Sequence, residues 1–182
     1  MIPLLLDRWT AAPTREEMTV LDRACGPVID VGCGPGRHVY ELAARGVLAL
    51  GIDISPDAVA VARRLGAAVL QRSVFDRVPN EGRWRTALLM DGNIGIGGDA
   101  VTLLDRLRGL MATHGSVLAE VEAPGLPSGV ELMRVERDGD VGPWFPWARV
   151  SLDGIDEIAE QVQLTRIWTY EEEGRWFVQL RS

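Results

Sequence analysis

The chain has 182 residues, a mass of 19.9 kDa and a net charge of −7 at pH 7. Its 47% apolar and 25% charged residues are typical of a folded globular protein and exclude a disordered chain, a collagen and a membrane bundle. The acidic balance disfavours sequence-independent binding to nucleic acid, and two cysteines and two histidines are too few to predict a disulfide framework or a zinc site.

The first 26 residues predict an extended stretch and then a short helix. The apolar stretch 2–6 is interrupted by Pro3 and is too short to span a bilayer. It also lacks the basic start and the cleavage site of a signal peptide, so we expect a cytoplasmic protein. Thr14 and Glu17 have the spacing of a capping box. The helix face expected to be buried carries Met18, Leu21 and Cys25.

Residues 27–122 alternate between strand-like and helix-like patterns. The strand-like apolar runs are 27–31, 47–54, 67–71, 86–90 and 116–121. Helix-period segments lie between most of them; Ser55-Pro56 begins one, Gly66 ends it, and Asp99 begins another. This alternation predicts a mostly parallel sheet that is covered by helices, which is an α/β three-layer sandwich.

The last third of the chain is predicted to be rich in β-structure. Residues 123–150 favour an added hairpin, with arms at 131–137 and 141–150 and a turn at 138–140. Pro143 and Pro146 restrict its second arm to an edge strand. Residues 151–182 predict a short helix and a final hairpin with arms at 164–171 and 175–180. We therefore expect one domain, 1–182, with a cofactor-binding core at 27–122.

Residues 28–38 form the most informative segment, V-I-D-V-G-C-G-P-G-R-H. It runs from a strand through a glycine turn into a helix, an arrangement that lets a ligand approach the backbone and the free N–H groups of the helix. Asp53 ends the second strand, 21 residues after Gly32. A carboxylate there can accept hydrogen bonds from both hydroxyls of an adenosine ribose. Together these features predict an adenosine-containing cofactor; the alternative is a tight structural turn only.

The glycine spacing argues against a dinucleotide. Gly32, Gly34 and Gly36 are two residues apart, and Arg37 stands where the third dinucleotide glycine would be. Asp30 precedes the turn, and its charge suits a ligand with an amine and a sulfonium but opposes a pyrophosphate. A nicotinamide-dependent oxidoreductase is therefore the weaker alternative.

The segment Asp30-Val31-Gly32-Cys33-Gly34-Pro35-Gly36 matches the motif D/E-x-G-x-G-x-G. In this motif, and in the acid Asp53 at the end of the second strand, the chain resembles the class I S-adenosylmethionine-dependent methyltransferases. The resemblance extends from about Val28 to Glu122, and the final hairpin fits the family's usual sheet ending. It implies a Rossmann-like fold with a seven-stranded, mostly parallel sheet and an antiparallel C-terminal strand. It also implies S-adenosyl-L-methionine as the cofactor.

The resemblance also implies roles for individual residues. Asp30 and the backbone of the glycine turn would hold the methionine end of the cofactor, and Asp53 the ribose. Ile54 would pack on the adenine, whose edge would meet Asp76 or a backbone group of Val74 or Phe75. The implied cofactor contacts are Asp30, Gly32, Gly34, Gly36, Asp53, Ile54, Val74, Phe75, Asp91 and Gly92.

The acceptor is expected to meet Asn93, Glu122, Trp144 and Trp147. Glu122 could orient a cationic amine or act as a base, or it could be a solvated loop residue. The tryptophans could wall the acceptor site or fix the hairpin to the domain. Arg8 and Trp9 would fold over the cofactor carboxylate as a lid.

Two further residues have alternative interpretations. Cys33 favours packing inside the turn over a nucleophilic role, because no base partner is evident. His38 favours a packed, hydrogen-bonded histidine over a contact with cofactor or substrate.

The sequence therefore predicts an enzyme that moves a methyl group by in-line attack to a small-molecule acceptor. No catalytic residue can be assigned, and no metal, nucleic acid or membrane partner is expected. A methyltransferase-like binding or partner subunit without activity is the alternative. The exposed aromatic hairpin suits a homodimer contact as well as a substrate lid.

Overall fold

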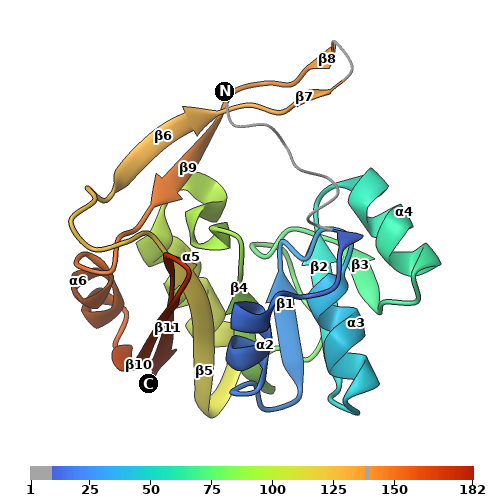
Figure 1. Ribbon diagram of the computed structural model, residues 1–182, viewed down its shortest axis with the longest axis horizontal. Helices are drawn as coiled ribbons and strands as arrows, with labels where there is room; N and C mark the ends of the chain where they lie inside the picture. Colours follow the sequence, from blue (N-terminus) through green and yellow to red (C-terminus); the bar gives the residue numbers. More distant parts are fainter. Residues whose placement is uncertain (1–9, 138–139) are drawn as a thin grey trace.

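The structure is a computed structural model that describes residues 10–137 and 140–182. Arg8 and Trp9, the expected lid, and the hairpin residues Asp138 and Gly139 lie outside the described residues. One seven-stranded sheet, in the order β10-β11-β5-β4-β1-β2-β3, forms the centre of the molecule (Figure 1). Its strands are β1 (Val28–Val31), β2 (Ala49–Asp53), β3 (Val69–Gln71), β4 (Trp84–Leu89), β5 (Met111–Val121), β10 (Thr165–Glu172) and β11 (Arg175–Arg181).

The directions of the strands confirm the predicted fold class. β1 pairs in parallel with β2 and β4, β2 with β3, and β4 with β5. The C-terminal strand β11 is antiparallel to both of its neighbours, β5 and β10. The carboxyl ends of β1, β2 and β4 therefore meet at one edge of the sheet, where open α/β sheets bind their ligands.

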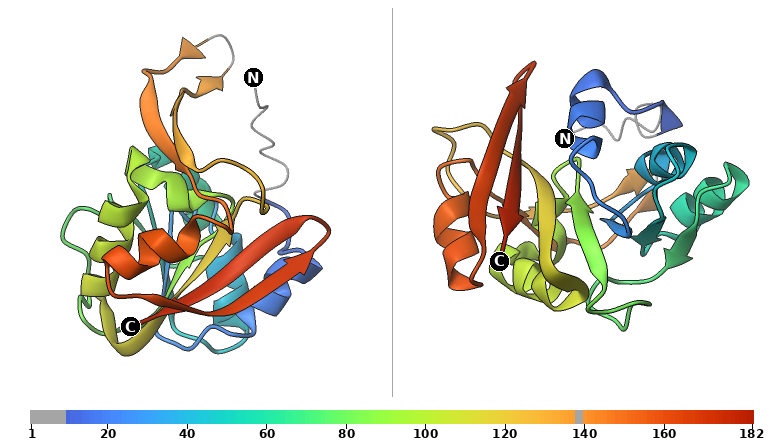
Figure 2. Two further views of the ribbon diagram at one scale, coloured as in Figure 1. Left: turned by 90° about the vertical axis from the view of Figure 1, so that its left-hand side faces the viewer. Right: turned by 90° about the horizontal axis from the view of Figure 1, so that it is seen from below.

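Helices cover both faces of the sheet (Figure 2). On one face lie α2 (Arg15–Leu21), α3 (Arg37–Ala44) and α4 (Pro56–Arg64), and on the other α5 (Ala100–Leu110) and α6 (Ile155–Gln161). Each layer has its own apolar cluster: Leu42 and Ala62 belong to the first, and Leu104 and Ile155 to the second. The sheet is thus buried on both sides, which explains the nearly continuous apolar runs of its central strands.

The helix caps follow the sequence signals. The side chain of Ser55 accepts a hydrogen bond from the N–H of Ala58 at the start of α4, and Asp99 does the same for Thr102 at the start of α5. Such a cap contributes about 1 kcal/mol of helix stability. The capping box of Thr14 and Glu17 at the start of α2 is also present.

The expected buried face of the first helix is partly wrong. The helix ends at Leu21, so Cys25 lies beyond it and is exposed. The N–H and C=O of Cys25 bond to Oγ1 of Thr86 instead, which directs the chain into β1. The buried residues of α2 are Glu16, Glu17, Val20 and Leu21.

The hairpin expected within 123–150 is present in two sections. β6 (Gly129–Met133) pairs with β9 (Phe145–Arg149), and β7 (Glu136–Arg137) pairs with β8 (Asp140–Val141). Both sections project beyond the sheet (Figures 1 and 2). Because β9 is an edge strand, it tolerates Pro146. The base of the hairpin lies against η1 (Asn93–Gly98), the segment that follows β4.

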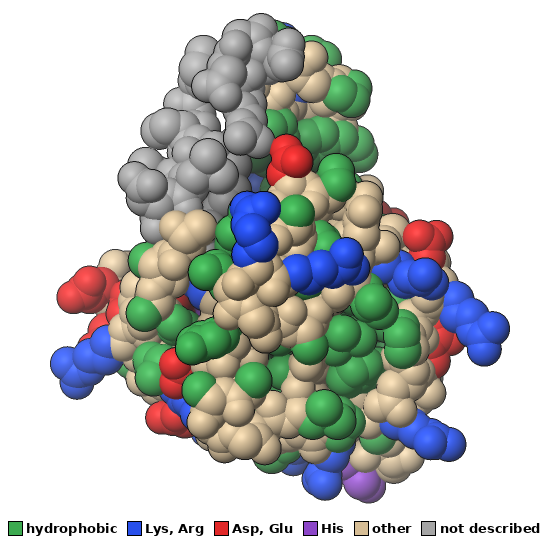
Figure 3. All heavy atoms as spheres, turned by 90° about the vertical axis from the view of Figure 1, so that its right-hand side faces the viewer, with side chains coloured by type: hydrophobic (Ala, Val, Ile, Leu, Met, Phe, Trp, Pro, Cys, Tyr) green, Lys and Arg blue, Asp and Glu red, His purple; other side chains and the backbone are tan. Residues whose placement is uncertain are grey.

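None of the helices in the described part of the chain combines the length and the apolar character needed to cross a membrane. On the face that carries β3 and α4, acidic and basic side chains are mixed with apolar ones and do not form a continuous basic surface (Figure 3).

Candidate active site

The glycine turn joins β1 to α3 at the carboxyl edge of the sheet. Gly32, Gly34 and Gly36 have φ angles of 70°, 53° and 82°, in the left-handed region that favours glycine. A Cβ on Gly34 would meet nothing within 4 Å, whereas one on Gly36 would lie 2.9 Å from the Cβ of Ala67. Gly36 therefore allows the helix to pack closely, and Gly34 leaves its side of the turn open to a ligand.

Asp53, at the end of β2, is bound to this turn. Its Oδ2 accepts a hydrogen bond from the N–H of Gly34 and its Oδ1 one from the N–H of Ser55, both at 2.8 Å. Each carboxylate oxygen can accept further bonds, so Asp53 keeps acceptor capacity for ligand hydroxyls. The two halves of the predicted nucleoside site are thus joined by a direct contact.

Asp30 lies in β1 as a buried carboxylate, and neither of its oxygens has a hydrogen-bond partner among the described residues. A cationic neighbour is His38 in the first turn of α3, with 3.6 Å between Nδ1 and Oδ2. A buried carboxylate with unused acceptors is costly unless a cationic or donor group completes it. The carboxylate oxygens of Asp30 therefore keep hydrogen-bond acceptor capacity next to the glycine turn.

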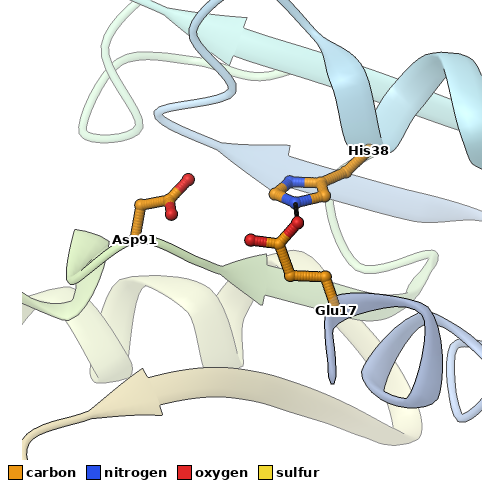
Figure 4. A group of neighbouring side chains, drawn as sticks. All are labelled: Glu17, His38 and Asp91. Carbon is orange, nitrogen blue, oxygen red and sulfur yellow. Dashed lines mark ion pairs between the residues drawn. The ribbon is translucent and has the colours of Figure 1, made fainter. Parts of the chain in front are cut away.

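His38 is buried between two carboxylates, since its Nε2 lies 3.6 Å from Oε2 of Glu17 (Figure 4). Burial lowers the pKa of His38, but the carboxylates of Asp30 and Glu17 outweigh this effect and raise that pKa to about 9. His38 is thus a packed imidazolium at neutral pH, which agrees with the packed interpretation.

Glu17 reaches this centre from α2 and is completely buried. Burial raises the pKa of Glu17, but the nearby imidazole of His38, hydrogen bonds from the N–H of Thr14 and from Arg175, and the charge of Arg37 hold that pKa well below its usual range. Arg37 Nη2 lies 2.8 Å from Glu17 Oε1 and 2.6 Å from Asp91 Oδ2. The α2 helix is thereby fixed to the cofactor edge of the sheet by charge.

Glu17, His38 and Asp91 could each offer a metal-ligand atom, and these atoms lie within 4.8 Å of one another (Figure 4). The guanidinium of Arg37 lies between the two carboxylates, however. The positive charge that balances them is therefore supplied by an arginine.

The expected adenine contacts lie around the ends of β2 and β3. Ile54 is 73% exposed and Phe75 43% exposed, whereas Val74 is buried. The ring of Phe75 packs against η1, because a Cβ on Gly97 would lie 3.0 Å from it. Asp76 is exposed, and its carbonyl accepts from Arg106. Ile54 and Phe75 thus offer apolar surface to a flat ligand, whereas Val74 offers only backbone groups.

The chain leaves β4 through a strained turn. Asp91 and Gly92 have φ angles of 54° and 77°, and the next residue, Asn93, turns back to the glycine turn. The Nδ2 of Asn93 donates to the carbonyls of Val31 and Gly32, both at 2.9 Å. The amide N–H groups of Asn93 are therefore used within the protein, and its carbonyl oxygen is its remaining polar group.

Cys33 packs inside the turn. A Cβ on Gly51 would lie 2.5 Å from its Sγ, so the small residue in β2 makes room for the thiol. Burial raises the pKa of Cys33, and the charges of Asp30 and Asp53 raise it further. The thiol stays protonated, which supports packing over a nucleophilic role.

The candidate acceptor residues lie at the base and in the arms of the added hairpin. Glu122 forms an ion pair with Arg149 of β9, with 3.0 Å between Oε1 and Nη2, so it is neither free nor solely solvated. Trp147 packs on η1, because a Cβ on Gly95 would lie 2.2 Å from its Nε1. Trp144 is 59% exposed, with the guanidinium of Arg134 4.7 Å from its ring centre.

Two parts of this site could not be found in the sequence. The first is Glu17, whose capping-box spacing was evident but whose burial under the glycine turn was not. The second is the η1 segment, in which Gly95, Gly97 and Gly98 make room for Trp147, Phe75 and Pro146. Three glycines in four residues were the available signal.

Residues 28–110 match a family model described as a methyltransferase domain. Among solved structures, the S-adenosylmethionine-dependent methyltransferase from Bacteroides fragilis, in complex with S-adenosyl-L-homocysteine, superposes with a TM-score of 0.82 at 22% identity over 98% of this chain and 81% of that chain. The 1,6-didemethyltoxoflavin-N1-methyltransferase from Burkholderia thailandensis superposes with a TM-score of 0.63 at 17% identity, over 85% of this chain and 70% of that chain. The methyltransferase CcbJ from Streptomyces caelestis superposes with a TM-score of 0.73 at 14% identity, over 96% of this chain and 92% of that chain.

A search of curated proteins found no match. The solved structures are at most 22% identical to this chain, so their similarity to it shows the fold alone. The matched family model identifies residues 28–110 as a methyltransferase domain, and the described chain has the fold of the S-adenosylmethionine-dependent methyltransferases.

Proposed function

We propose that this protein transfers a methyl group from S-adenosylmethionine to a small-molecule acceptor by in-line attack. The proposal rests on one observation: an open glycine turn lies between two carboxylates that differ in their hydrogen bonding. Asp30 is buried with unused acceptors, and Asp53 is bound to the turn with acceptor capacity left over. The first suits an ammonium group and the second a ribose.

The proposed cofactor contacts follow from this placement. The backbone from Gly32 to Gly36 would hold the methionine end, and Asp91 and Gly92 would flank it from the end of β4. Ile54 and Phe75 would cover the adenine, with the backbone at Val74 along its edge. Arg37, at the third position of the dinucleotide fingerprint, is engaged by Glu17 and Asp91, which disfavours a pyrophosphate ligand.

The bound cosubstrate supplies an electrophilic methyl group on a sulfonium. The protein's own contribution is alignment and exclusion of water, which together lower the barrier without a dedicated base for a neutral amine or thiolate acceptor. The rigid glycine turn and the αL turn at Asp91 fix one side of the reacting centre. A hydroxyl acceptor would require a base.

The proposed acceptor site lies between η1 and the hairpin. Trp147 and Trp144 would supply aromatic contact area, Asn93 its carbonyl oxygen, and Glu122 a carboxylate whose charge is shared with Arg149. The short hairpin offers a small platform, which favours a small acceptor over a macromolecule. The Burkholderia enzyme, whose structure contains 1,6-didemethyltoxoflavin, supports the same class of acceptor. The cytoplasmic location and the homodimer stay predictions.

The test is calorimetric titration with S-adenosylhomocysteine of the wild type, Asp53→Ala and the control Asp105→Ala. Asp105 is an exposed carboxylate on α5 that pairs with Arg108, away from the proposed site. We expect micromolar binding to the wild type and the control and loss of binding in Asp53→Ala. A wild type that does not bind at millimolar ligand would contradict the proposal. Binding without turnover of any acceptor in a panel of amines, phenols and thiols would favour the non-catalytic subunit.

A further inference from the structure

Arg175, the first residue of β11, connects three segments that are distant in the sequence. Its Nε and Nη2 donate to the two carboxylate oxygens of Glu120 on β5, both at 2.8 Å. Its Nη1 donates to Oε1 of Glu17 at 2.8 Å, and its Nη2 lies 3.5 Å from Oδ1 of Asp91. A guanidinium can make this set of contacts because its donors have a fixed planar arrangement.

Glu120 transmits this contact to the backbone. Its Oε2 also accepts a hydrogen bond from the N–H of Asp91 at 2.8 Å. Asp91 has a φ of 54°, a conformation that a non-glycine residue keeps only when its surroundings enforce it. Two sets of contacts enforce it here. Glu120 binds the N–H of Asp91, and Arg37 and Arg175 hold its carboxylate.

The αL turn at Asp91 in turn decides where Asn93 lies. With this turn in place, the amide of Asn93 bonds to the carbonyls of Val31 and Gly32. A Cβ on Gly32 would lie 2.7 Å from that amide nitrogen, so the two segments are in close contact. A series of contacts therefore leads from Arg175 to the glycine turn: hydrogen bonds join Arg175 to Glu120 and Glu120 to Asp91, the backbone leads on to Asn93, and hydrogen bonds join Asn93 to Val31 and Gly32.

The series is well shielded from solvent. The side chains of Arg175 and Glu120 are each 14% exposed, and that of Glu17 is completely buried. Charge-assisted and bidentate hydrogen bonds are stronger than neutral ones, and burial reduces their screening by salt. These contacts therefore suit a rigid support rather than a solvated surface ion pair.

We propose that Arg175 and Glu120 are positioning residues that hold Asp91 and the glycine turn in the geometry that receives the methionine end of the cosubstrate. The inference rests on the proposed function, and it adds to it two residues outside the cofactor motif. Neither side chain needs to touch the ligand, because both act through the backbone of Asp91 and the side chain of Asn93.

The experiment measures the affinity of two ligands for Arg175→Gln and for the control Arg166→Gln. Arg166 lies on the same final hairpin and makes a bidentate pair with Asp156, which is more exposed to solvent and lies away from the glycine turn. S-adenosylhomocysteine keeps the amino-acid part of the methionine end, and 5′-methylthioadenosine lacks it. Both variants lose one paired arginine, and the ratio of the two affinities within each variant separates a local effect on the methionine end from a general loss of stability.

We expect Arg175→Gln to lower the affinity for S-adenosylhomocysteine roughly tenfold, since the loss of a hydrogen bond to a charged group costs about that factor. The affinity for 5′-methylthioadenosine should fall less than that for S-adenosylhomocysteine, because Ile54 and Phe75 lie outside the series and Asp53 is linked to it only through the N–H of Gly34. Arg166→Gln should change neither affinity. Arg175→Lys keeps the charge without the bidentate contact and should recover only part of the loss.

Three outcomes are decisive. Equal weakening of both ligands in Arg175→Gln, or no weakening while the wild type binds, would overturn the positioning role alone. A wild type that does not bind S-adenosylhomocysteine would overturn the proposed function and this inference with it. If Arg175→Gln does not fold, Glu120→Gln provides the same comparison, because it keeps one acceptor oxygen for Asp91 but removes the charge that pairs with Arg175.

Discussion

The Oδ2 of Asp53 accepts a hydrogen bond from the N–H of Gly34 at 2.8 Å, so the ends of β1 and β2 are joined within the candidate site itself. Gly34 has a φ of 53° here, in the left-handed region that favours glycine. The ribose carboxylate is therefore oriented by the same turn that would receive the methionine end. Such preorganisation reduces the ordering that ligand binding must impose.

The open side of Gly34 gives the first prediction. Gly34→Ala should destabilise the fold by about 1 kcal/mol, because residue 34 has a positive φ. It should also lower the affinity for S-adenosylhomocysteine roughly tenfold, because the added methyl group occupies the ligand's side of the turn. Gly46→Ala is the matched control: Gly46 has a φ of 74° and equally open surroundings, but it follows α3 at the far end. Urea unfolding and calorimetry would compare them. Equal affinities in the two variants would contradict the placement of the ligand.

The second prediction concerns the packing of Cys33 against β2. Gly51→Ala places a Cβ 2.5 Å from the Sγ of Cys33 and should cost about 1–3 kcal/mol of unfolding free energy through overpacking. Combining it with Cys33→Ala removes the sulfur and should restore part of that loss. Urea unfolding of the two single variants and the double variant measures the coupling. Strictly additive effects would show that the two side chains do not compete for this space.

Much of the architecture follows from local signals in the sequence. The glycine turn, the caps at Ser55 and Asp99 and the alternating apolar runs fix the parallel core, because each signal acts on residues close to it in the chain. The two carboxylates Asp30 and Asp53 could be assigned for the same reason, since each one lies at the end of a strand. The sheet order then follows from the family's pattern.

The rest depends on contacts that periodicity does not encode. Glu17 lies in the first turn of a helix whose expected buried face omitted it. An acidic residue becomes a core position only where partners such as Arg37, Arg175 and His38 converge from other elements. Likewise, Glu120 alternates with Glu122 at the end of β5, but only the folded chain shows that their arginine partners come from β11 and β9 respectively.

The third prediction tests the packing of the hairpin against η1. Gly95→Ala would place a Cβ 2.2 Å from Nε1 of Trp147 and 2.4 Å from the carbonyl of Ala148. Because a backbone atom is one of the neighbours, β9 must shift, and we expect a loss of about 1–3 kcal/mol and faster proteolysis within 123–150. Limited proteolysis with mass spectrometry would locate the cleavage.

Gly109→Ala provides the control for this variant. Gly109 lies in α5, and a Cβ on it would meet nothing within 4 Å, so alanine should stabilise the helix by about 0.5–1 kcal/mol. The hairpin of this variant should be cleaved at the wild-type rate. An unchanged cleavage rate in Gly95→Ala would show that the hairpin is not held by η1.

The last prediction is a dependence of stability on pH that comes from His38. Burial and the charge of nearby Arg37 lower the pKa of this imidazole, but the carboxylates of Asp30 and Glu17 that face it outweigh both and raise that pKa from 6.5 to about 9 in the folded state. A pKa raised by folding means that the folded state binds the proton more tightly than the unfolded state. The stabilisation is therefore complete below about pH 6.5 and is lost as the pH rises through about 9. Urea unfolding of the wild type and His38→Gln between pH 6 and 10 would isolate this contribution, since every other group titrates in both proteins. The wild type should lose stability relative to the variant across that window, and parallel curves would show that His38 is not held as a cation.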